Sequence, residues 1–125
     1  MPKTDKTTLE NKKIQLIVDS IDDKKGHDTV VINLKKFDNT IADYFVITDA
    51  TTNVQVKAIA DNVRKLLSKN LKAKPMGVEG ETLAEWILLD YGDVIVHVFQ
   101  RPVREYYDIE SLWEDAEMIK TNANE

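Results

Sequence analysis

The sequence predicts a single-domain α+β protein with a mixed sheet of about five strands, covered by helices mainly on one face. The 125 residues are 42% hydrophobic, which is enough apolar material for one core. Segments with helical periodicity alternate with segments rich in β-branched residues, and no repeat or long linker divides the chain. We expect an ordered core over about residues 9–118 and a flexible tail over 119–125.

The first elements are predicted to be a helix and a hairpin. Apolar residues recur at helical spacing over 14–21, opposite charged residues, and Gly26 is expected to end this helix. Residues 29–34 and 43–48 are rich in β-branched and aromatic side chains. They predict two strands that pair through a turn near the Asp-Asn dipeptide at 38–39.

A second helix and a short strand are predicted next. Thr52 or Asn53 can cap a helix whose apolar stripe runs over residues 56–67 and leaves its charged residues in water. That stripe requires a sheet beneath it. After Pro75, residues 76–80 predict a short strand that ends in a glycine-controlled turn.

The clearest hairpin joins residues 84–90 to residues 93–100, with Tyr91-Gly92 or Gly92-Asp93 as its tight turn. Pro102 closes this hairpin. The following residues predict a helical turn around positions 106–107 and a last helix over 109–116. From Thr121 onward we expect a frayed tail.

Side-chain alternation gives this hairpin two chemically different faces. The face expected to pack under the helices is uniformly aliphatic: Ile87, Leu89, Val94, Val96 and Val98. The other face mixes large apolar groups with two acids and an imidazole: Trp86, Leu88, Asp90, Asp93, Ile95, His97 and Phe99. Burial of this face would leave its acids without partners, whereas full exposure would leave Trp86 in water.

A binding surface centred on Trp86 would resolve this conflict, because tryptophan is a common interface anchor. The alternative is that Trp86 covers the sheet edge beneath the C-terminal helix, with Trp113 and Phe99 as companions. Two interpretations are also possible for Arg101 and Arg104, which lie beside two tyrosines in the sequence. They either contact RNA by stacking and phosphate pairing or pin the last helix to the sheet.

Few residues offer catalytic or metal-binding chemistry. The chain has no cysteine, so disulfides, thiol nucleophiles and cysteine-ligated metals are excluded. Its glycines form no phosphate-binding motif, and its serines lack a nucleophile elbow. His97 has no second histidine nearby and is interpreted as structural rather than as a general base or metal ligand. The acid pairs Asp22-Asp23 and Glu79 with Glu81 are interpreted as solvated surface.

Charge and hydropathy favour a cytoplasmic protein with a basic protein partner. The net charge of −5 argues against broad contact with nucleic acid, which favours a basic face. Charged residues interrupt every apolar stretch before the roughly 20 residues of a membrane span. Residues 1–13 lack the apolar core of a secretion signal, so we expect no export and no membrane partner.

Several blocks, taken in order, resemble the Iojap-related ribosomal silencing factors. The resemblance extends over about residues 9–116, and its strongest block is the hairpin from Trp86 to Phe99. The other blocks are residues 43–47, 55–61, 77–80 and 104–107, together with Leu112-Trp113. Because these blocks are ordered along nearly the whole chain, the resemblance is far more specific than a single short motif.

The resemblance implies a nucleotidyltransferase-like fold without enzymatic activity, catalytic residues or cofactor. It implies binding to the large ribosomal subunit through ribosomal protein L-fourteen, which blocks joining of the small subunit when nutrients are scarce. Carried over by position, the partner-binding residues are Trp86, Leu88, Asp90, Gly92 and Asp93, with His97, Arg104 and Tyr107 as neighbours.

Two further functions stay open. Resemblance to organellar relatives also suggests an assembly factor for the large subunit. A nucleotide-handling remnant would use His97 with Asp90 or Asp93. A homodimer and limited contact with ribosomal RNA also stay open.

Overall fold

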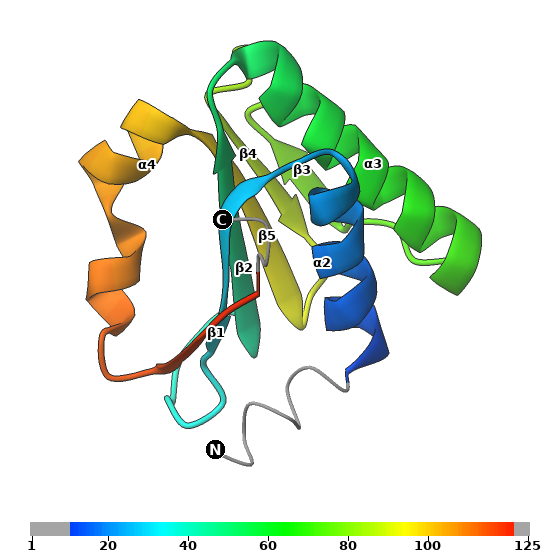
Figure 1. Ribbon diagram of the computed structural model, residues 1–125. Helices are drawn as coiled ribbons and strands as arrows, with labels where there is room; N and C mark the ends of the chain where they lie inside the picture. Colours follow the sequence, from blue (N-terminus) through cyan, green and yellow to red (C-terminus); the bar gives the residue numbers. More distant parts are fainter. Residues whose placement is uncertain (1–10, 122–125) are drawn as a thin grey trace.

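Six strands form one mixed sheet in the order β3-β4-β5-β2-β1-β6 in the computed structural model, which describes residues 11–121 (Figure 1). Neighbouring strands are antiparallel except for the central pair, β2 and β5, which is parallel. The mixed sheet confirms the predicted α+β class and contains one strand more than expected. The strands are β1 (His27–Asn33), β2 (Tyr44–Ala50), β3 (Gly77–Glu79), β4 (Trp86–Asp90), β5 (Val94–Gln100) and β6 (Glu117–Lys120).

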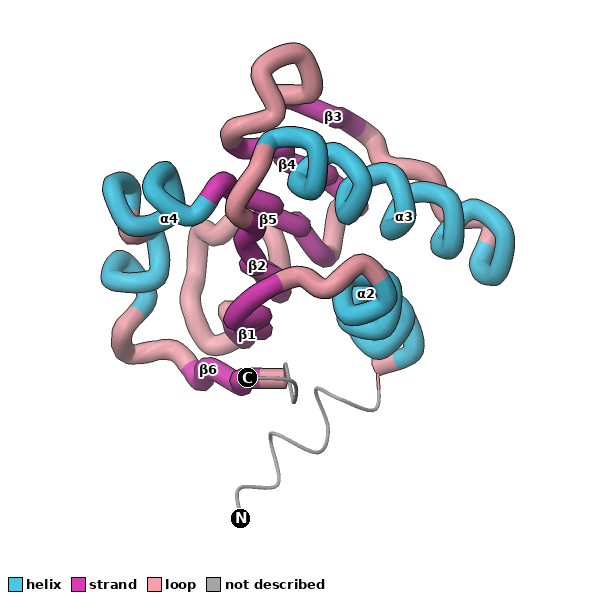
Figure 2. The backbone as a smooth tube through the Cα atoms, turned by 45° about the horizontal axis from the view of Figure 1, so that its top comes forward, coloured by secondary structure: helices cyan, strands magenta, loops and turns pink. Residues whose placement is uncertain are grey.

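The two long helices cover one face of the sheet, and shorter helical segments cover the other (Figures 1 and 2). Helices α2 (Lys12–Asp23) and α3 (Asn53–Leu71) pack against each other and against the sheet. Helix α4 (Arg101–Tyr107) and the 3-10 helix η1 (Ile109–Trp113) lie on the opposite face. The expected coverage of one face is therefore correct for the long helices, but the second face is covered as well.

The helix ends follow from local capping groups. The Asn11 side chain accepts hydrogen bonds from the backbone of Lys13 and Ile14, at 3.0 and 3.1 Å, and so caps α2. Of the two candidate caps for α3, Thr52 is the one used, because its hydroxyl accepts the backbone N–H of Gln55 at 3.1 Å. Helix α3 then crosses over the sheet, as the connection between the parallel strands β2 and β5 requires.

Apolar side chains form one cluster on each face of the sheet. On the α2–α3 face, the predicted aliphatic residues of the β4–β5 hairpin are all buried, which confirms the face assignment for Ile87, Leu89, Val94, Val96 and Val98. The second cluster lies between the sheet and the α4–η1 segment. Its fully or partly buried members include Ile32, Phe45, Ile47, Ile95, Phe99, Trp86, Leu88, Val103, Ile109 and Trp113.

The C-terminal region differs from the prediction. The prediction of a helix over residues 109–116 is wrong, because only a 3-10 helix forms there. It ends at Trp113, and strand β6 follows. Strand β6 pairs with β1 and buries only Ile119, so its four residues carry too little apolar pattern to be predicted. Residues 119 and 120, which were expected in a flexible tail, lie in this strand. Residues 9, 10 and 122–125 of the expected core and tail lie outside the described residues.

The β3–β4 turn depends on a glycine. Gly80 has φ +85°, and a Cβ there would lie 1.9 Å from the backbone oxygen of Trp86. We therefore predict that Gly80→Ala lowers the free energy of unfolding by about 2 kcal/mol or more, measured by urea denaturation. The matched control is Gly77→Ala, where a Cβ would meet nothing within 4 Å. Equal losses in both variants would contradict this account of the turn.

Candidate functional site

The Trp86 indole is held by groups from strand β5 and helix α4. In the β4–β5 pairing Trp86 lies opposite Phe99, and their rings stack with centroids 4.8 Å apart. Tyr107 of α4 contacts the indole with a centroid distance of 5.0 Å. The indole N–H donates to His97 Nδ1 at 3.1 Å. These contacts fix the position of a large apolar side chain that is only partly buried.

Trp86 belongs to a partly exposed apolar surface. Leu88 follows it on the same face of β4 and is also half-buried. Tyr106 and Tyr107 continue the surface onto α4 and are 81% and 52% exposed. We call Trp86, Leu88, Tyr106 and Tyr107 the Trp86 surface. The covering alternative is met in part, because one side of the indole packs on Phe99. The residue also keeps an exposed part, and a binding surface there stays a prediction.

Trp113 is not the companion of Trp86 that the covering alternative requires. Its ring instead contacts Phe37 and Phe45, with centroid distances of 5.5 and 6.1 Å. Trp113 therefore closes the core beneath η1, whereas Trp86 lies beside α4.

His97 supports Trp86 from inside the protein. Its side chain is buried, with 4% exposure, and packs against Phe45 at a centroid distance of 4.7 Å. Because an indole N–H can only donate, His97 Nδ1 must accept, which places the imidazole proton on Nε2. Burial lowers the pKa of His97 to about 4. The ring is therefore neutral at cellular pH and acts as a hydrogen-bond acceptor that positions Trp86.

The predicted acids do not flank Trp86. Asp90 lies at the far end of β4, about 13 Å along the strand from Trp86. Its Oδ1 accepts the backbone N–H of Gly92 at 2.8 Å and so stabilises the turn. Asp93 Oδ1 pairs with Lys13 Nζ of α2 at 2.9 Å, on the face that the long helices cover. Placing Asp93 on the Trp86 face was wrong, because β5 and its alternation begin only at Val94.

Arg104 lies in the interior rather than on a surface. It is 7% exposed, and its guanidinium bonds Asp49 at 2.8 Å and Glu110 at 3.0 and 2.9 Å. It also donates to the backbone oxygen of Asp28 at 2.9 Å. Arg101 reaches Asp49 as well, at 2.9 Å. Between the two alternatives for this arginine cluster, the geometry favours pinning the last helix to the sheet.

Asp49 was missed by the sequence reasoning. It is 2% exposed at the end of β2, and it accepts from both arginines and contacts His27 Nδ1 at 3.1 Å. An acid inside an apolar strand requires a cation nearby. That pattern was visible in the sequence, but the fifty or so residues between Asp49 and Arg104 hide the pairing.

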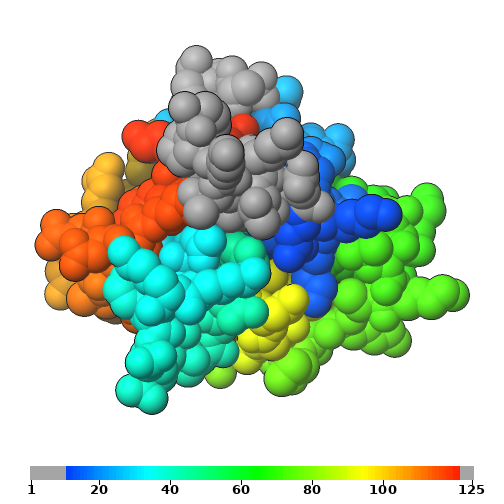
Figure 3. Space-filling view, turned by 90° about the horizontal axis from the view of Figure 1, so that it is seen from below, coloured from blue at the N-terminus to red at the C-terminus, as the bar shows by residue number. Residues whose placement is uncertain are grey.

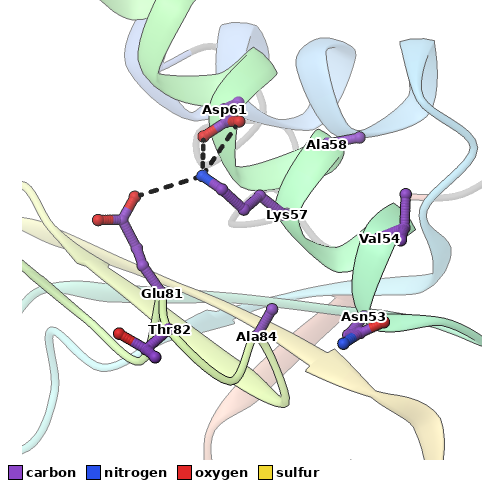
Figure 4. Close-up of a pocket in the computed structure, with 8 residues that line it drawn as sticks. All are labelled: Asn53, Val54, Lys57, Ala58, Asp61, Glu81, Thr82 and Ala84. Atoms are coloured by element: carbon purple, nitrogen blue, oxygen red, sulfur yellow. Dashed lines mark hydrogen bonds and ion pairs between the residues drawn. The ribbon is translucent and has the colours of Figure 1, made fainter.

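A hollow of about 370 Å³ separates the first turns of α3 from the β3–β4 turn (Figure 4). Within it, Lys57 pairs with Asp61 at 3.3 Å and with Glu81 at 3.9 Å. Glu81 also accepts from Arg64 at 2.8 Å, so this acid joins the turn to α3. The charged groups in the hollow therefore neutralise one another.

Residues 11–121 hold no group of three or more side chains that could bind a metal ion together. None of the helices in that range has the length and apolar character needed to cross a membrane.

Comparisons with known proteins extend over most of the chain. The family model described as "Ribosomal silencing factor during starvation" matches residues 6–125. Ribosomal silencing factor RsfS of Halalkalibacterium halodurans is 40% identical over 108 residues, which cover 86% of this chain and 90% of that protein. A crystal structure from Chromobacterium violaceum is similar with a TM-score of 0.78 and 36% identity, and covers 82% of this chain and 84% of that chain.

A more distant similarity links the chain to an organellar protein. Mitochondrial assembly of ribosomal large subunit protein 1 of Mus musculus is 27% identical over 103 residues. The match covers 80% of this chain and 44% of that protein. The names of both relatives describe ribosome-associated roles, and neither name describes a reaction.

The buried histidine predicts a pH-dependent stability. The unfolded chain binds a proton at His97 below about pH 6.5, whereas the folded chain resists protonation until about pH 4. Stability from this group is therefore fully present above pH 6.5 and is lost as the pH falls toward 4, by about 3 kcal/mol. Urea denaturation at several pH values measures this loss. His97→Gln, whose side-chain oxygen can still accept from Trp86, should lack this dependence of stability on pH. An equal loss of stability in both proteins would exclude His97 as its cause.

The buried ion pair predicts a large stability loss on truncation. Arg104→Met leaves Glu110 without its arginine and Asp49 with only the more exposed Arg101 and His27, and should lower the free energy of unfolding by about 3 kcal/mol or more. The double variant Asp49→Asn/Arg104→Met should recover part of this loss, because the uncompensated buried charge is removed. Urea denaturation of both variants checks this. A loss below about 1 kcal/mol for the single variant would contradict a pinning role.

Proposed function

This chain belongs to the ribosomal silencing factor family, and we propose that it binds the large ribosomal subunit and blocks its association with the small subunit. The match of the family model to residues 6–125 carries this proposal. The relatives are named for a regulatory role rather than a catalytic one. On this proposal the protein represses translation in the cytoplasm when nutrients are limited.

We place the docking site at the Trp86 surface. A partner that covers it would remove Trp86, Leu88, Tyr106 and Tyr107 from water, and aromatic residues of this kind contribute most to interface affinity. The contacts with Phe99, Tyr107 and His97 order the indole before binding, which lowers the entropy cost of association.

The proposed partner at this surface is ribosomal protein L-fourteen. The family resemblance is the reason for naming it, and the chain's net charge of −5 suits a basic ribosomal protein. Asp90, Gly92 and Asp93 lie at the other end of the hairpin, where they would contact the partner only at the margin of the interface. Arg104 is proposed to act indirectly, by holding α4 and therefore Tyr107 in place.

The proposed mechanism is steric and stoichiometric. A folded chain of this length is about 35 Å across, so one bound copy occupies space that the small subunit needs for direct contact. No bond is formed or broken, and one copy inactivates one subunit for as long as it stays bound. Repression then depends on the concentration of the factor relative to free large subunits.

Assembly of the large subunit is a second candidate function. The similarity to the mouse protein named for mitochondrial assembly of the large subunit favours it. Ribosome profiles distinguish the two functions. Precursor particles that accumulate after deletion of the gene indicate assembly, whereas excess joined ribosomes during starvation indicate silencing.

The geometry gives little support to a nucleotide-handling remnant. His97 is buried and bonded to Trp86, and neither Asp90 nor Asp93 has a hydrogen bond or ion pair with it. A general base must reach a substrate proton. Titration with nucleotides and divalent metal ions tests this alternative directly.

Truncation of the anchor should weaken subunit binding. We expect Trp86→Ala to reduce affinity for purified large subunits about thirtyfold or more in co-sedimentation, the range of an anchor residue. Because Trp86 also packs on Phe99, Tyr107→Ala is a second test that leaves the bond to His97 in place. The matched control is Val54→Ala, since Val54 is 77% exposed on α3, across the sheet from Trp86.

The same variants should fail to prevent joining of the two subunits, which sucrose gradients measure directly. Unchanged binding of folded Trp86→Ala and Tyr107→Ala would refute the docking site. Binding by the wild type without any effect on joining would refute the silencing mechanism.

A further inference from the structure

A basic groove lies between the C-terminal half of α3 and strand β3. Its volume is about 550 Å³, and its lining residues include Arg64, Lys65, Ser68, Lys74 and Met76. Two further exposed lysines, Lys69 and Lys72, lie beside it at the end of α3. We use the name basic groove for this hollow together with these two lysines.

The charge of this region is opposite to that of the chain. Residues 62–78 contain five cations and no acid, whereas the whole chain has a net charge of −5, so the remaining residues carry −10. Such segregation of one sign creates a local positive field on an acidic protein. The field is available to an external anion only if the cations are not already paired within the chain.

Four of the five cations are unpaired among the described residues. Arg64 bonds Glu81, but no acid of residues 11–121 lies within ion-pair distance of Lys65, Lys69, Lys72 or Lys74. All four are exposed. Elsewhere Lys13, Lys57, Arg101 and Arg104 are each paired with an acid, and the other exposed lysines of the described residues are spread over α2, the loops and β6 instead of lining a hollow. The groove lysines are therefore free to bind an anionic partner.

The groove is built on ordered backbone. The loop after α3 is fixed by hydrogen bonds from Lys72 N to Ser68 O and from Ala73 N to Leu67 O, both 3.1 Å. Met76 N then donates to Asp90 O at 2.6 Å and joins the loop to β4. Lys65 and Lys69 are four residues apart on one helix, so they lie on the same side of α3. A strand of regularly spaced phosphates can meet such a row without reorganising the backbone.

The groove and the Trp86 surface belong to the same edge of the sheet. In the pairing of β3 with β4, Gly77 lies opposite Asp90 and Glu79 lies opposite Leu88. The groove lies on the α3 side of this edge, and Trp86 and Leu88 lie on the α4 side. Figure 3 shows the yellow turn after β4, which follows the end of β4 far from Trp86, on the same side of the molecule as the green α3. A partner large enough to pass around this edge can contact both.

We propose that the basic groove binds the phosphate backbone of ribosomal RNA while the Trp86 surface docks on protein. This inference rests on the proposed function, because the large subunit presents RNA beside its surface proteins. The observations favour RNA over a membrane, because the lysines surround a hollow instead of a flat amphipathic face. The observations also favour the groove over Arg101 and Arg104 as the site of RNA contact, because Asp49 and Glu110 neutralise these two arginines.

Charge removal tests the groove. The triple variant Lys65→Gln/Lys69→Gln/Lys74→Gln is compared with Lys12→Gln/Lys24→Gln/Lys120→Gln. The second variant removes three exposed lysines, from α2, its C-terminal cap and β6, that form no ion pair with any acid of residues 11–121. Affinity for purified large subunits is measured from low to high salt. Affinity for RNA phosphates decreases with salt, so a plot of log affinity against log salt has a negative slope. For the groove variant this slope should become shallower by about 2 to 3, since each phosphate contact contributes about 0.7 to 0.9 to its magnitude. The control should keep the wild-type slope.

A site-specific probe identifies the anion. The chain contains no cysteine, so Asn70→Cys provides one attachment point for an iron chelate beside the groove without loss of a lysine. Hydroxyl radicals from this site should cut ribosomal RNA in the bound subunit. The same chelate on Asp19→Cys of α2 serves as the distance control.

The outcomes separate this inference from the proposed function. A reduced slope together with cuts from position 70 supports the inference. Binding with an unchanged slope, or a reduced slope without cuts in RNA, overturns it and leaves the proposed function intact. The second of these results would indicate an acidic protein surface instead. If wild-type protein does not bind large subunits at all, the proposed function fails and the inference fails with it.

Discussion

The parallel pairing of β2 with β5 is the constraint on which the rest of the structure depends. Parallel neighbours need a long crossover, which α3 provides, and α3 in turn buries one face of the sheet. The pairing also brings the carboxyl ends of both strands to the same end of the sheet, so that Asp49 meets the arginines that follow β5. With β5 fixed in this way, the antiparallel hairpin sets β4 and places Trp86 opposite Phe99.

The two faces of the sheet are buried to different degrees, and this difference generates the candidate site. On the α3 face, aliphatic side chains are buried completely beneath two long helices. On the opposite face, α4 and η1 are short and cover Phe45, Ile47 and Phe99 but only part of Trp86 and Leu88. A binding surface here therefore results from incomplete coverage of a core, with its anchor already packed on that core.

Local pattern predicted most of the fold. The alternation in β4 and β5 and the apolar stripe of α3 were sufficient for the hairpin, its buried face and the helix above it. Strand β6 was missed because four residues with one buried side chain give no periodicity.

The site was predicted less well, because its chemistry depends on contacts between distant residues. Trp86, Leu88 and His97 share a face by alternation and were found, but Asp93 precedes the strand and bonds Lys13, eighty positions away in the sequence. Asp49, one of the two acids that Arg104 bonds, is likewise 55 positions away from it. The spacing of apolar residues along the sequence gives no information about pairs of residues that are so far apart.

The shortness of the outermost strands has a consequence for behaviour in a crowded cell. An unpaired strand edge is a template for pairing with another chain and so for aggregation. At one edge of this sheet β3 has three residues, and at the other edge β6 has four and begins and ends with a charged residue. Neither offers a long, flat row of free backbone groups, so uncontrolled growth of the sheet by addition of further copies is disfavoured.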